Sequence, residues 1–225
     1  MEYLRMSRTL RRITMGIVGL LLLYLLCLLY PQPFFPFKAR RGNITIYASR
    51  AVPSSLFDEV NNLLRRSPLD DTTITQRVFV CGSVFQFGFF TRGRTNLGGL
   101  CDNRLTRNIF IRPASPDFDR VPGDPRPLSY FIAHEITHSL ESHYVGRWSL
   151  REPTWLWEGY ADYIGDPRSI SRLLDVYRAR SPQAYDRYAL YVTYLLDLEH
   201  QDIRDLLRRP PARDSVEAAV QGLAR

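Results

Sequence analysis

The chain has 225 residues, of which 45% are hydrophobic and 24% charged, and it carries a formal net charge of +7. This length suits an N-terminal segment followed by one domain with a sizeable core. Residues 1–41 contain seven Lys or Arg and one acid, a net charge of +6, which leaves +1 for the remaining 184 residues. The basic balance belongs to the N-terminus, so we expect no nucleic-acid partner.

An apolar segment follows the first basic residues. Residues 13–30 are nearly all apolar, and as a helix they reach about 27 Å, enough to cross a thin hydrocarbon core. Four Arg precede them, which predicts a cytoplasmic tail at residues 1–12 and a single-pass signal anchor at residues 13–30. The alternative is secretion after cleavage of a signal peptide, although bulky, Pro-rich residues stand where small ones are expected. Both interpretations place the rest of the chain outside the cytoplasm.

The segment after the span has three Pro residues and a basic cluster, and we predict a linker at residues 31–42. The extracytoplasmic domain is then expected at residues 43–225. Its first half contains short β-branched or aromatic runs, and these predict strands with one amphipathic helix among them. The predicted strands are residues 43–47, 76–81, 84–90 and 108–112, the helix is residues 53–66, and a Gly-rich loop includes residues 93–99.

After a Pro-rich connection the pattern becomes helical. The predicted helices are residues 128–143, 154–164, 169–179 and 183–199, with shorter helices at the end of the chain. Strands followed by helices indicate the α+β class, with a mixed N-terminal sheet and a C-terminal helical part.

Two of the three cysteines lie in the outer domain. In an oxidising compartment, Cys81 and Cys101 can form a disulfide that closes a loop of about twenty residues. The alternative is two unrelated buried thiols, because the distance between them is not visible in the sequence.

The segment HEITH at residues 134–138 carries the chemistry. On a helix, His134 and His138 are one turn apart on one face, so both imidazoles can reach one ion. Glu135 stands one step round the helix, where it can contact a zinc-bound water instead of the metal. A catalytic Zn²⁺ site needs three protein ligands and one open position.

The third ligand is expected on the next helix. Nineteen residues separate His138 from Glu158, and the turn between the two predicted helices can bring Glu158 alongside. Asp162 follows one helical turn later on the same face. It can accept the outer N–H of a ligand histidine and thereby set its tautomer.

These residues resemble the gluzincins, zinc metallopeptidases in which HExxH is followed by a Glu on the next helix. HEITH is similar to the thermolysin-like motif, and WLWEGYADY at residues 155–163 resembles the WLNEGFA segment of the aminopeptidase N-like family. The resemblance covers about residues 128–200. It implies a zincin-like fold, Zn²⁺ as the cofactor, a peptide or protein substrate, and Glu135 as the catalytic base.

Two further segments are compared with the aminopeptidases. Residues 184–195 resemble the segment that opens PYEKG, whose Tyr stabilises the oxyanion; this implies Tyr185 for that role, with Tyr188 as second candidate. The amine-recognising GxMEN motif has only a loose counterpart at residues 98–103, which lack its Met and Glu. Exopeptidase action is therefore not implied, and the strand at residues 108–112 is expected to be the sheet edge that pairs with an extended substrate.

The pattern predicts a membrane-anchored zinc metallopeptidase. The alternative is a catalytically inactive zinc-binding domain that acts as a membrane-tethered binding or structural module. Glu135 favours the enzyme, because a purely structural site has no need of a base. The sequence carries no signal for an oligomeric state.

Overall fold

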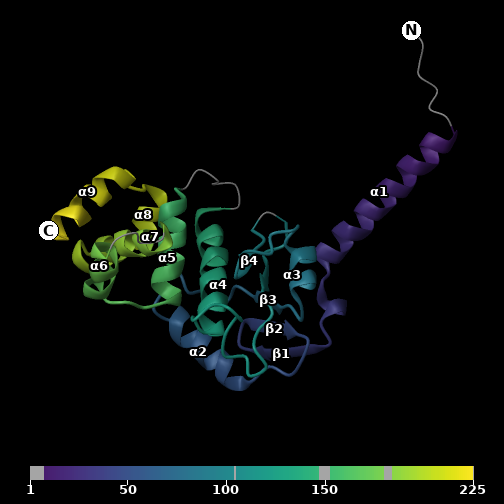
Figure 1. Cartoon of the computed structure of the whole chain (residues 1–225), viewed down its shortest axis with the longest axis horizontal. Coiled ribbons are helices and arrows are strands. Elements are labelled where there is room, and N and C mark those ends of the chain that lie inside the picture. The colour runs from purple at the N-terminus through teal and green to yellow at the C-terminus, as the bar shows by residue number, and fades with distance from the viewer. Residues whose placement is uncertain (1–7, 104, 147–152, 180–183, 225) are drawn as a thin grey trace, which may run out of the picture.

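The computed structural model describes residues 8–103, 105–146, 153–179 and 184–224. A long apolar helix leads into a mixed five-stranded sheet with helices, and a helical part ends the chain (Figure 1). This confirms the predicted mixture of α and β structure. The strands are β1 (Phe37–Arg41), β2 (Ile44–Ala48), β3 (Gln76–Val80), β4 (Gly99–Cys101) and β5 (Asn108–Ile111). The helices are α1 (Arg8–Leu29), η1 (Gln32–Phe34), α2 (Ser54–Leu64), α3 (Val84–Phe90), α4 (Leu128–Val145), α5 (Thr154–Gly165), α6 (Ile170–Arg178), α7 (Ala184–Thr193), the π-helical η2 (Tyr194–Leu198), α8 (Ile203–Arg208) and α9 (Arg213–Leu223).

The sheet has the strand order β1-β2-β3-β5-β4. The inner strands β2, β3 and β5 run parallel, whereas β1 and β4 pair antiparallel with their neighbours. The expectation that residues 108–112 form a sheet edge was wrong, because β5 lies between β3 and β4. The edge on this side is β4, in a segment that we expected to be a loop. At the other edge, β1 takes up part of the expected linker.

One face of the sheet carries an aliphatic core. Because side chains alternate along a strand, Val78 and Val80 of β3 point to this face together with Ile109 and Ile111 of β5. Helices α2 and α4 pack here, and α5 and α7 extend the same core away from the sheet (Figure 1). Most residues of α4 from Leu128 onward are buried, which makes it the central helix of the domain.

The opposite face carries an aromatic core. Tyr47, Phe79 and Phe110 stack across three strands, with ring centroids 4.8 and 5.4 Å apart. Phe90 of α3 stacks on Phe110 at 5.0 Å, and Phe35 packs against Phe79. This face is covered by α3, the segment after α1 and the end of α1 itself. The buried members of the aromatic core are Leu28, Phe35, Phe79, Cys81, Phe87, Phe90 and Phe110.

The C-terminal end of α1 is part of this core. Its residues Leu10–Leu29 have a mean hydropathy of 2.3, long and apolar enough for a membrane span or a signal sequence. The Tyr24 hydroxyl donates to the carbonyl of Phe89 at 2.7 Å, and the buried Asn108 amide donates to the carbonyl of Leu28 at 3.1 Å. The last turns of α1 are therefore bonded to the domain, whereas its earlier turns project away from it (Figure 1).

Residues 84–90 form the helix α3, so the strand predicted there was wrong. The aromatic and β-branched residues suggested a strand, but capping and burial decide the conformation. The Ser83 side chain accepts the backbone N–H of Gln86 at 3.1 Å, and the Gln86 side chain accepts the N–H of Gly82 at 2.6 Å. This reciprocal pattern begins a helix, and Ser83 followed by Gln86 is its sequence signal.

Cys81 and Cys101 are free thiols in this structure. Cys81 is buried in the aromatic core, whereas Cys101 packs against the aliphatic core. The two thiols lie in the cores on opposite faces of the sheet, and β5 lies between β3, which Cys81 directly follows, and β4, which carries Cys101. The disulfide between them is therefore not formed.

Candidate metal centre

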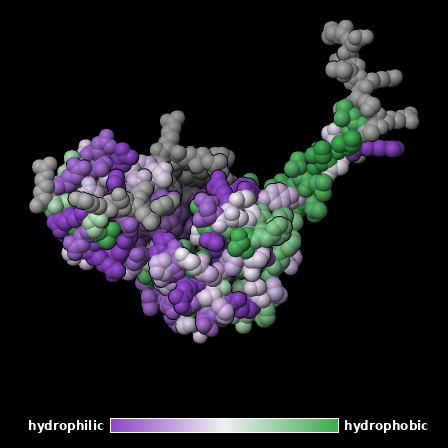
Figure 2. All heavy atoms as spheres, viewed as in Figure 1, coloured by the Kyte–Doolittle hydropathy of each residue, from purple (hydrophilic) through white to green (hydrophobic). Residues whose placement is uncertain are grey.

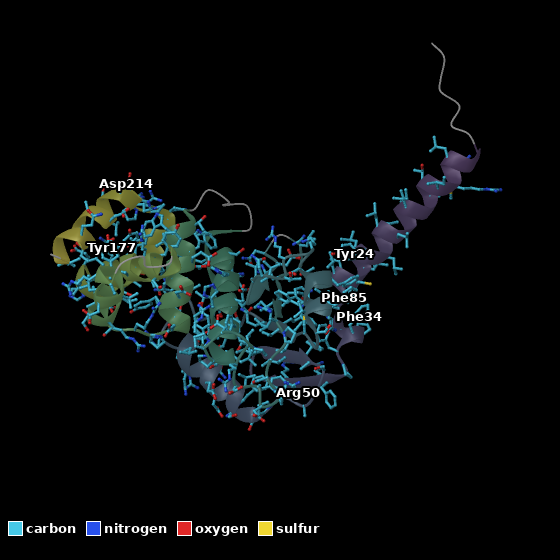
Figure 3. The ribbon with its side chains drawn as sticks, in the orientation of Figure 1. Tyr24, Phe34, Arg50, Phe85, Tyr177 and Asp214 are labelled. Carbon is cyan, nitrogen blue, oxygen red and sulfur yellow. The ribbon has the colours of Figure 1, made fainter. Side chains whose placement is uncertain are left out.

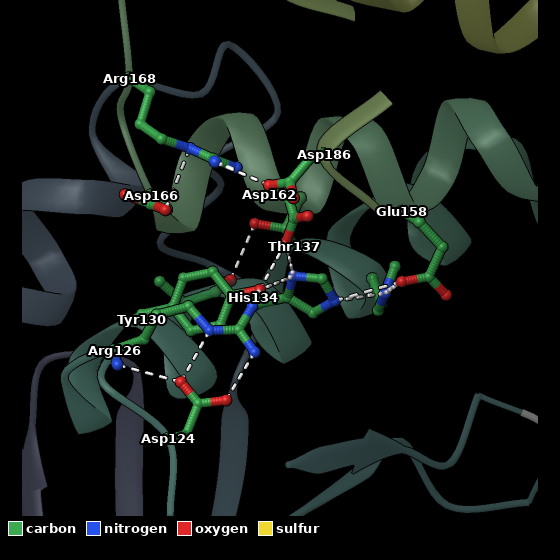
Figure 4. Close-up of polar contacts among 12 residues, drawn as sticks. Asp124, Arg126, Tyr130, His134, Thr137, Glu158, Asp162, Asp166, Arg168 and Asp186 are labelled. Carbon is green, nitrogen blue, oxygen red and sulfur yellow. Dashed lines mark hydrogen bonds and ion pairs between the residues drawn. The ribbon is translucent and has the colours of Figure 1, made fainter. Parts of the chain in front are cut away.

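Two neighbouring helices bring the predicted ligands together. His134 and His138 stand one turn apart on α4, and Glu158 stands on α5, which packs along α4. Figure 4 shows Glu158 directed toward the His134 ring. All three side chains point into the space between the helices. One nitrogen of each imidazole and one oxygen of Glu158 lie within 4.8 Å of one another, so the three residues can hold a metal ion.

The separations between the candidate ligand atoms fit one ion. The Nε2 atoms of His134 and His138 are 3.2 Å apart, and Oε2 of Glu158 lies 3.4 and 3.6 Å from them. Donors bound at about 2.0–2.1 Å in tetrahedral geometry lie about 3.3 Å from one another. The three atoms therefore form one triangular face of such a site, which leaves the fourth position for another molecule.

The second nitrogen of His134 contacts Asp162. Its Nδ1 lies 3.0 Å from Oδ1 of Asp162, which is one turn beyond Glu158 on α5 and only 2% exposed. Burial alone lowers the pKa of His134, but Asp162 and Glu158 outweigh it and raise that pKa to about 9. The contact fixes the ring so that Nε2 faces the other ligands. Asp162 thus lies where the sequence predicted it.

Asp162 is itself held by a chain of polar contacts (Figure 4). The Tyr130 hydroxyl donates to Asp162 and lies 3.4 Å from Nδ1 of His134. Arg126 donates to the Tyr130 hydroxyl at 2.6 Å and makes a two-pronged ion pair with Asp124 at 2.8 and 2.9 Å. These contacts fix the orientation of Asp162 and were not predicted: Tyr130 stands one turn before His134 on α4, and Asp124 and Arg126 lie in the Pro-rich segment before that helix.

The second nitrogen of His138 contacts Glu141, which the sequence reasoning missed. Its Nδ1 lies 2.8 Å from Oε2 of Glu141, a fully buried carboxylate one turn later on the same helix. Burial raises the pKa of Glu141 to about 7, with His138 acting in the opposite direction. Both histidines therefore have a carboxylate on the nitrogen that faces away from the candidate site. The acid three residues after the motif is the signal that reveals Glu141.

Glu135 lies between α4 and the edge strand β4. Its side chain is 7% exposed, and the backbone N–H of Cys101 donates to it. A Cβ atom added to Gly99 would lie 2.7 Å from Oε1 of Glu135, and one added to Gly98 would lie 2.2 Å from the Phe131 ring. The two glycines let the strand approach the motif helix closely, which encloses the Glu135 carboxylate. Burial raises the pKa of this carboxyl above its ordinary value.

The charges of this region favour a cation. Carboxylates of Glu135, Glu141, Glu158 and Asp162 surround two imidazoles in largely buried surroundings. Burial raises the pKa of Glu158, but hydrogen bonds from both histidines outweigh it and hold the pKa far below its usual range. An excess of buried negative charge requires bound protons or a bound metal ion to be stable.

The two candidate oxyanion donors lie on α7. Tyr188 is half-buried, and its backbone packs on α5 at Gly159, directly after Glu158: a Cβ atom on Gly159 would lie 2.4 Å from the Tyr188 carbonyl oxygen. Tyr185 belongs to the same helix, and its side chain lies outside the described part of the structure. The choice between them remains a prediction.

Comparison with known protein families, with characterised proteins and with solved structures gave no match. The geometry of this candidate centre is therefore the basis for a function.

Proposed function

We propose that this chain is a membrane-anchored zinc metallopeptidase with a zincin-like domain. The observation that carries the proposal is the triangle of His134 Nε2, His138 Nε2 and Glu158 Oε2, with sides of 3.2–3.6 Å. Two imidazoles and one carboxylate with an open fourth position are a donor set typical of catalytic zinc. The carboxylates behind both histidines favour the tautomer that presents Nε2 to a metal.

The residues around this triangle suit hydrolysis of a peptide bond. A bound zinc ion supplies Lewis acidity, which acidifies a water molecule and polarises the scissile carbonyl. Glu135 accepts a proton from the attacking water and delivers it to the leaving amine. Asp162 and Glu141 keep the two imidazoles in position, and Tyr185 or Tyr188 donates to the oxyanion, a contribution typically worth about 10²–10³-fold in turnover.

The edge strand β4 is the candidate for binding the substrate backbone. Extended peptides add to sheet edges through main-chain hydrogen bonds. Of the two edge strands, β4 is the one beside Glu135, since the backbone N–H of Cys101 donates to that carboxylate. A peptide that pairs with β4 would lie next to the base, and β4 thus takes the role that the sequence suggested for β5.

The proposed topology is a single pass with the N-terminus in the cytoplasm. Arg11 and Arg12 are exposed on the first turns of α1, at the end that lies away from the domain. Cleavage of a signal peptide after the span would remove Tyr24 and Leu28, which are bonded to the domain. These contacts support an uncleaved anchor over the secreted alternative.

The alternative function is a zinc-binding module without activity. The burial of Glu135 beside the ligands favours the enzyme, because a structural zinc site needs four ligands and no adjacent base.

The experiment is to purify the full chain in mild detergent, count zinc per chain, and measure peptide hydrolysis with and without a chelator. We expect one zinc per chain and hydrolysis that is lost on chelation and restored by zinc. Glu135→Gln should keep the zinc and lose about 10²–10⁴-fold in turnover. Glu59→Gln, on the exposed side of α2, is the matched control and should behave as the parent chain.

Zinc binding without hydrolysis in the parent chain would establish the inactive module instead. Undiminished hydrolysis by Glu135→Gln would exclude Glu135 as the base.

A further inference from the structure

Exposed apolar side chains gather where α1 meets the domain. Phe85 on α3 is 85% exposed, the highest value among the exposed large hydrophobic residues of the described chain. Figure 3 places it close to Phe34 and Tyr24, and Figure 2 shows the apolar surface of α1 running down to this place. We name this group the aromatic foot; its members are Tyr30, Phe34, Phe37, Val84 and Phe85. Single exposed apolar residues are ordinary, but a group beside an apolar helix indicates an interaction surface.

The aromatic foot is held firmly against α1. The ring of Tyr24 meets that of Phe89 edge to face at 5.0 Å, and its hydroxyl bonds to the Phe89 carbonyl. Phe34 packs against Phe90 at 5.6 Å, and its carbonyl accepts the Gln86 side chain at 3.0 Å. The height of α3 along the axis of α1 is therefore fixed by the fold.

The length of α1 sets that height relative to a bilayer. The uncharged part of the helix, residues 13–29, spans about 26 Å, whereas a hydrocarbon core is about 30 Å thick. If the helix crosses the membrane, the whole of this stretch must therefore lie inside the hydrocarbon core. Tyr24 lies five residues before Leu29, which is about 7.5 Å along the axis. The part of α3 that contacts Tyr24 is then level with the last quarter of the span.

We propose that the aromatic foot is seated in the outer boundary of the bilayer, at the level of the headgroups and the first acyl carbons. Tyr side chains are enriched at this boundary, and Phe side chains occur on the apolar face of segments that lie in it. This placement removes Phe85 from water. It also lengthens the apolar surface along the membrane normal, where the helix alone is shorter than the hydrocarbon core. The occupant of this surface is thus the lipid that surrounds α1, and the domain rests on the membrane.

This inference rests on the membrane insertion that we propose for α1, and it is independent of hydrolysis. The experiment uses the full chain in phosphatidylcholine vesicles whose acyl chains are brominated close to the headgroup. Phe85→Trp adds one fluorophore at the foot. Leu223→Trp is the matched control, since Leu223 is also an exposed apolar residue and lies on α9 at the far end of the domain (Figure 1). Extraction at alkaline pH tests separately whether α1 is inserted.

We expect the added emission of Phe85→Trp to lose most of its intensity in brominated vesicles, and that of Leu223→Trp to keep it. Phe34→Trp provides a second position in the foot and should also be quenched. A chain that resists extraction but shows equal emission in brominated and ordinary vesicles at both foot positions would overturn the inference and leave the anchor intact. If the foot positions are not quenched and the chain dimerises through this surface, its occupant is a second copy of the chain. A chain that alkali removes would overturn both the anchor and the foot.

Discussion

The two faces of the sheet are covered in different ways. On one face, α2 and α4 pack an aliphatic core against Val78 and Ile109, and α4 carries the candidate metal ligands. On the other face, the rings of Phe79 and Phe110 meet α3 and the end of α1. The first face holds the polar and ionisable groups of the candidate metal centre, and the second holds an almost wholly apolar contact with α1. The candidate site and the contact with α1 thus lie on opposite faces of one sheet, and substitutions on the two faces should have separable effects.

The largest expected effect is on the aromatic face. Phe110→Ala removes a ring that is 1% exposed and stacked between Phe79 and Phe90. We expect the free energy of unfolding to fall by about 3–5 kcal/mol, measured by denaturant titration in detergent. The chain that remains folded should bind zinc as the parent does, and Phe110→Leu should lose less stability. If Phe110→Ala weakens zinc binding of the folded chain, the two faces are not separable.

The next largest effect is expected from a substitution of a candidate metal ligand. Glu158→Gln replaces the carboxylate that joins α5 to the two histidines of α4. We expect zinc affinity to fall by more than about 100-fold, or about 2.7 kcal/mol, because a ligand counts for more than its outer partners. Competition with a chromophoric chelator measures this loss. Affinity equal to that of the parent would remove Glu158 from the ligand set.

The carboxylates of Asp162 and Glu141, which contact the Nδ1 atoms of the two histidines, provide a finer test on the face that carries the candidate metal centre. Asp162→Asn and Glu141→Gln each keep the shape of the side chain but alter the partner of one histidine. Each should lower zinc affinity by about 10–100-fold, with little change in the fold. An unchanged affinity for Glu141→Gln would mean that His138 needs no such partner. The same chelator competition, with circular dichroism for the fold, provides the measurement.

The smallest effect tests the joint between α1 and the sheet. Asn108→Ala removes the donor to the Leu28 carbonyl and leaves that oxygen without this bond. The cost is expected at about 1 kcal/mol of unfolding free energy, because Oδ1 of Asn108 is buried without a partner among the described residues and its removal offsets part of the loss. Zinc affinity should not change. A loss of zinc together with stability would show that the joint supports the metal centre.

The candidate metal centre was largely predictable from the sequence because its parts are periodic along helices. His134 and His138 are one turn apart, and Glu158 and Asp162 repeat the same spacing on the next helix. The structure brings all four together. Glu141 was missed although its spacing from His138 is also helical, because a Glu on a helix is usually exposed and only the packing of α4 shows that this one is buried. The chain from Asp124 to Tyr130 depends on a fold contact that no local pattern reveals.

The aromatic face was predicted poorly, for a physical reason. Its contacts join segments far apart in the chain, such as Tyr24 with Phe89 and Asn108 with Leu28. Residues 84–90 have strand-forming side chains, and their helical state is set by the Ser83 cap and by packing on the sheet. The strand β4 has only three residues, and it begins at Gly99 directly after Gly98, so this segment looks like a loop until the neighbouring helix is known. The secondary-structure propensity of a short segment is therefore a poor guide where aromatic contacts with segments far away in the chain stabilise its conformation.

The hydrogen bond between Asn108 and the carbonyl of Leu28 has a consequence for any cut that separates α1 from the domain. A protease that cut the chain between α1 and β1 would leave Leu28 and Tyr24 on the other fragment and open the aromatic core to water. A fragment that begins at β1 is therefore expected to be less stable than the full chain.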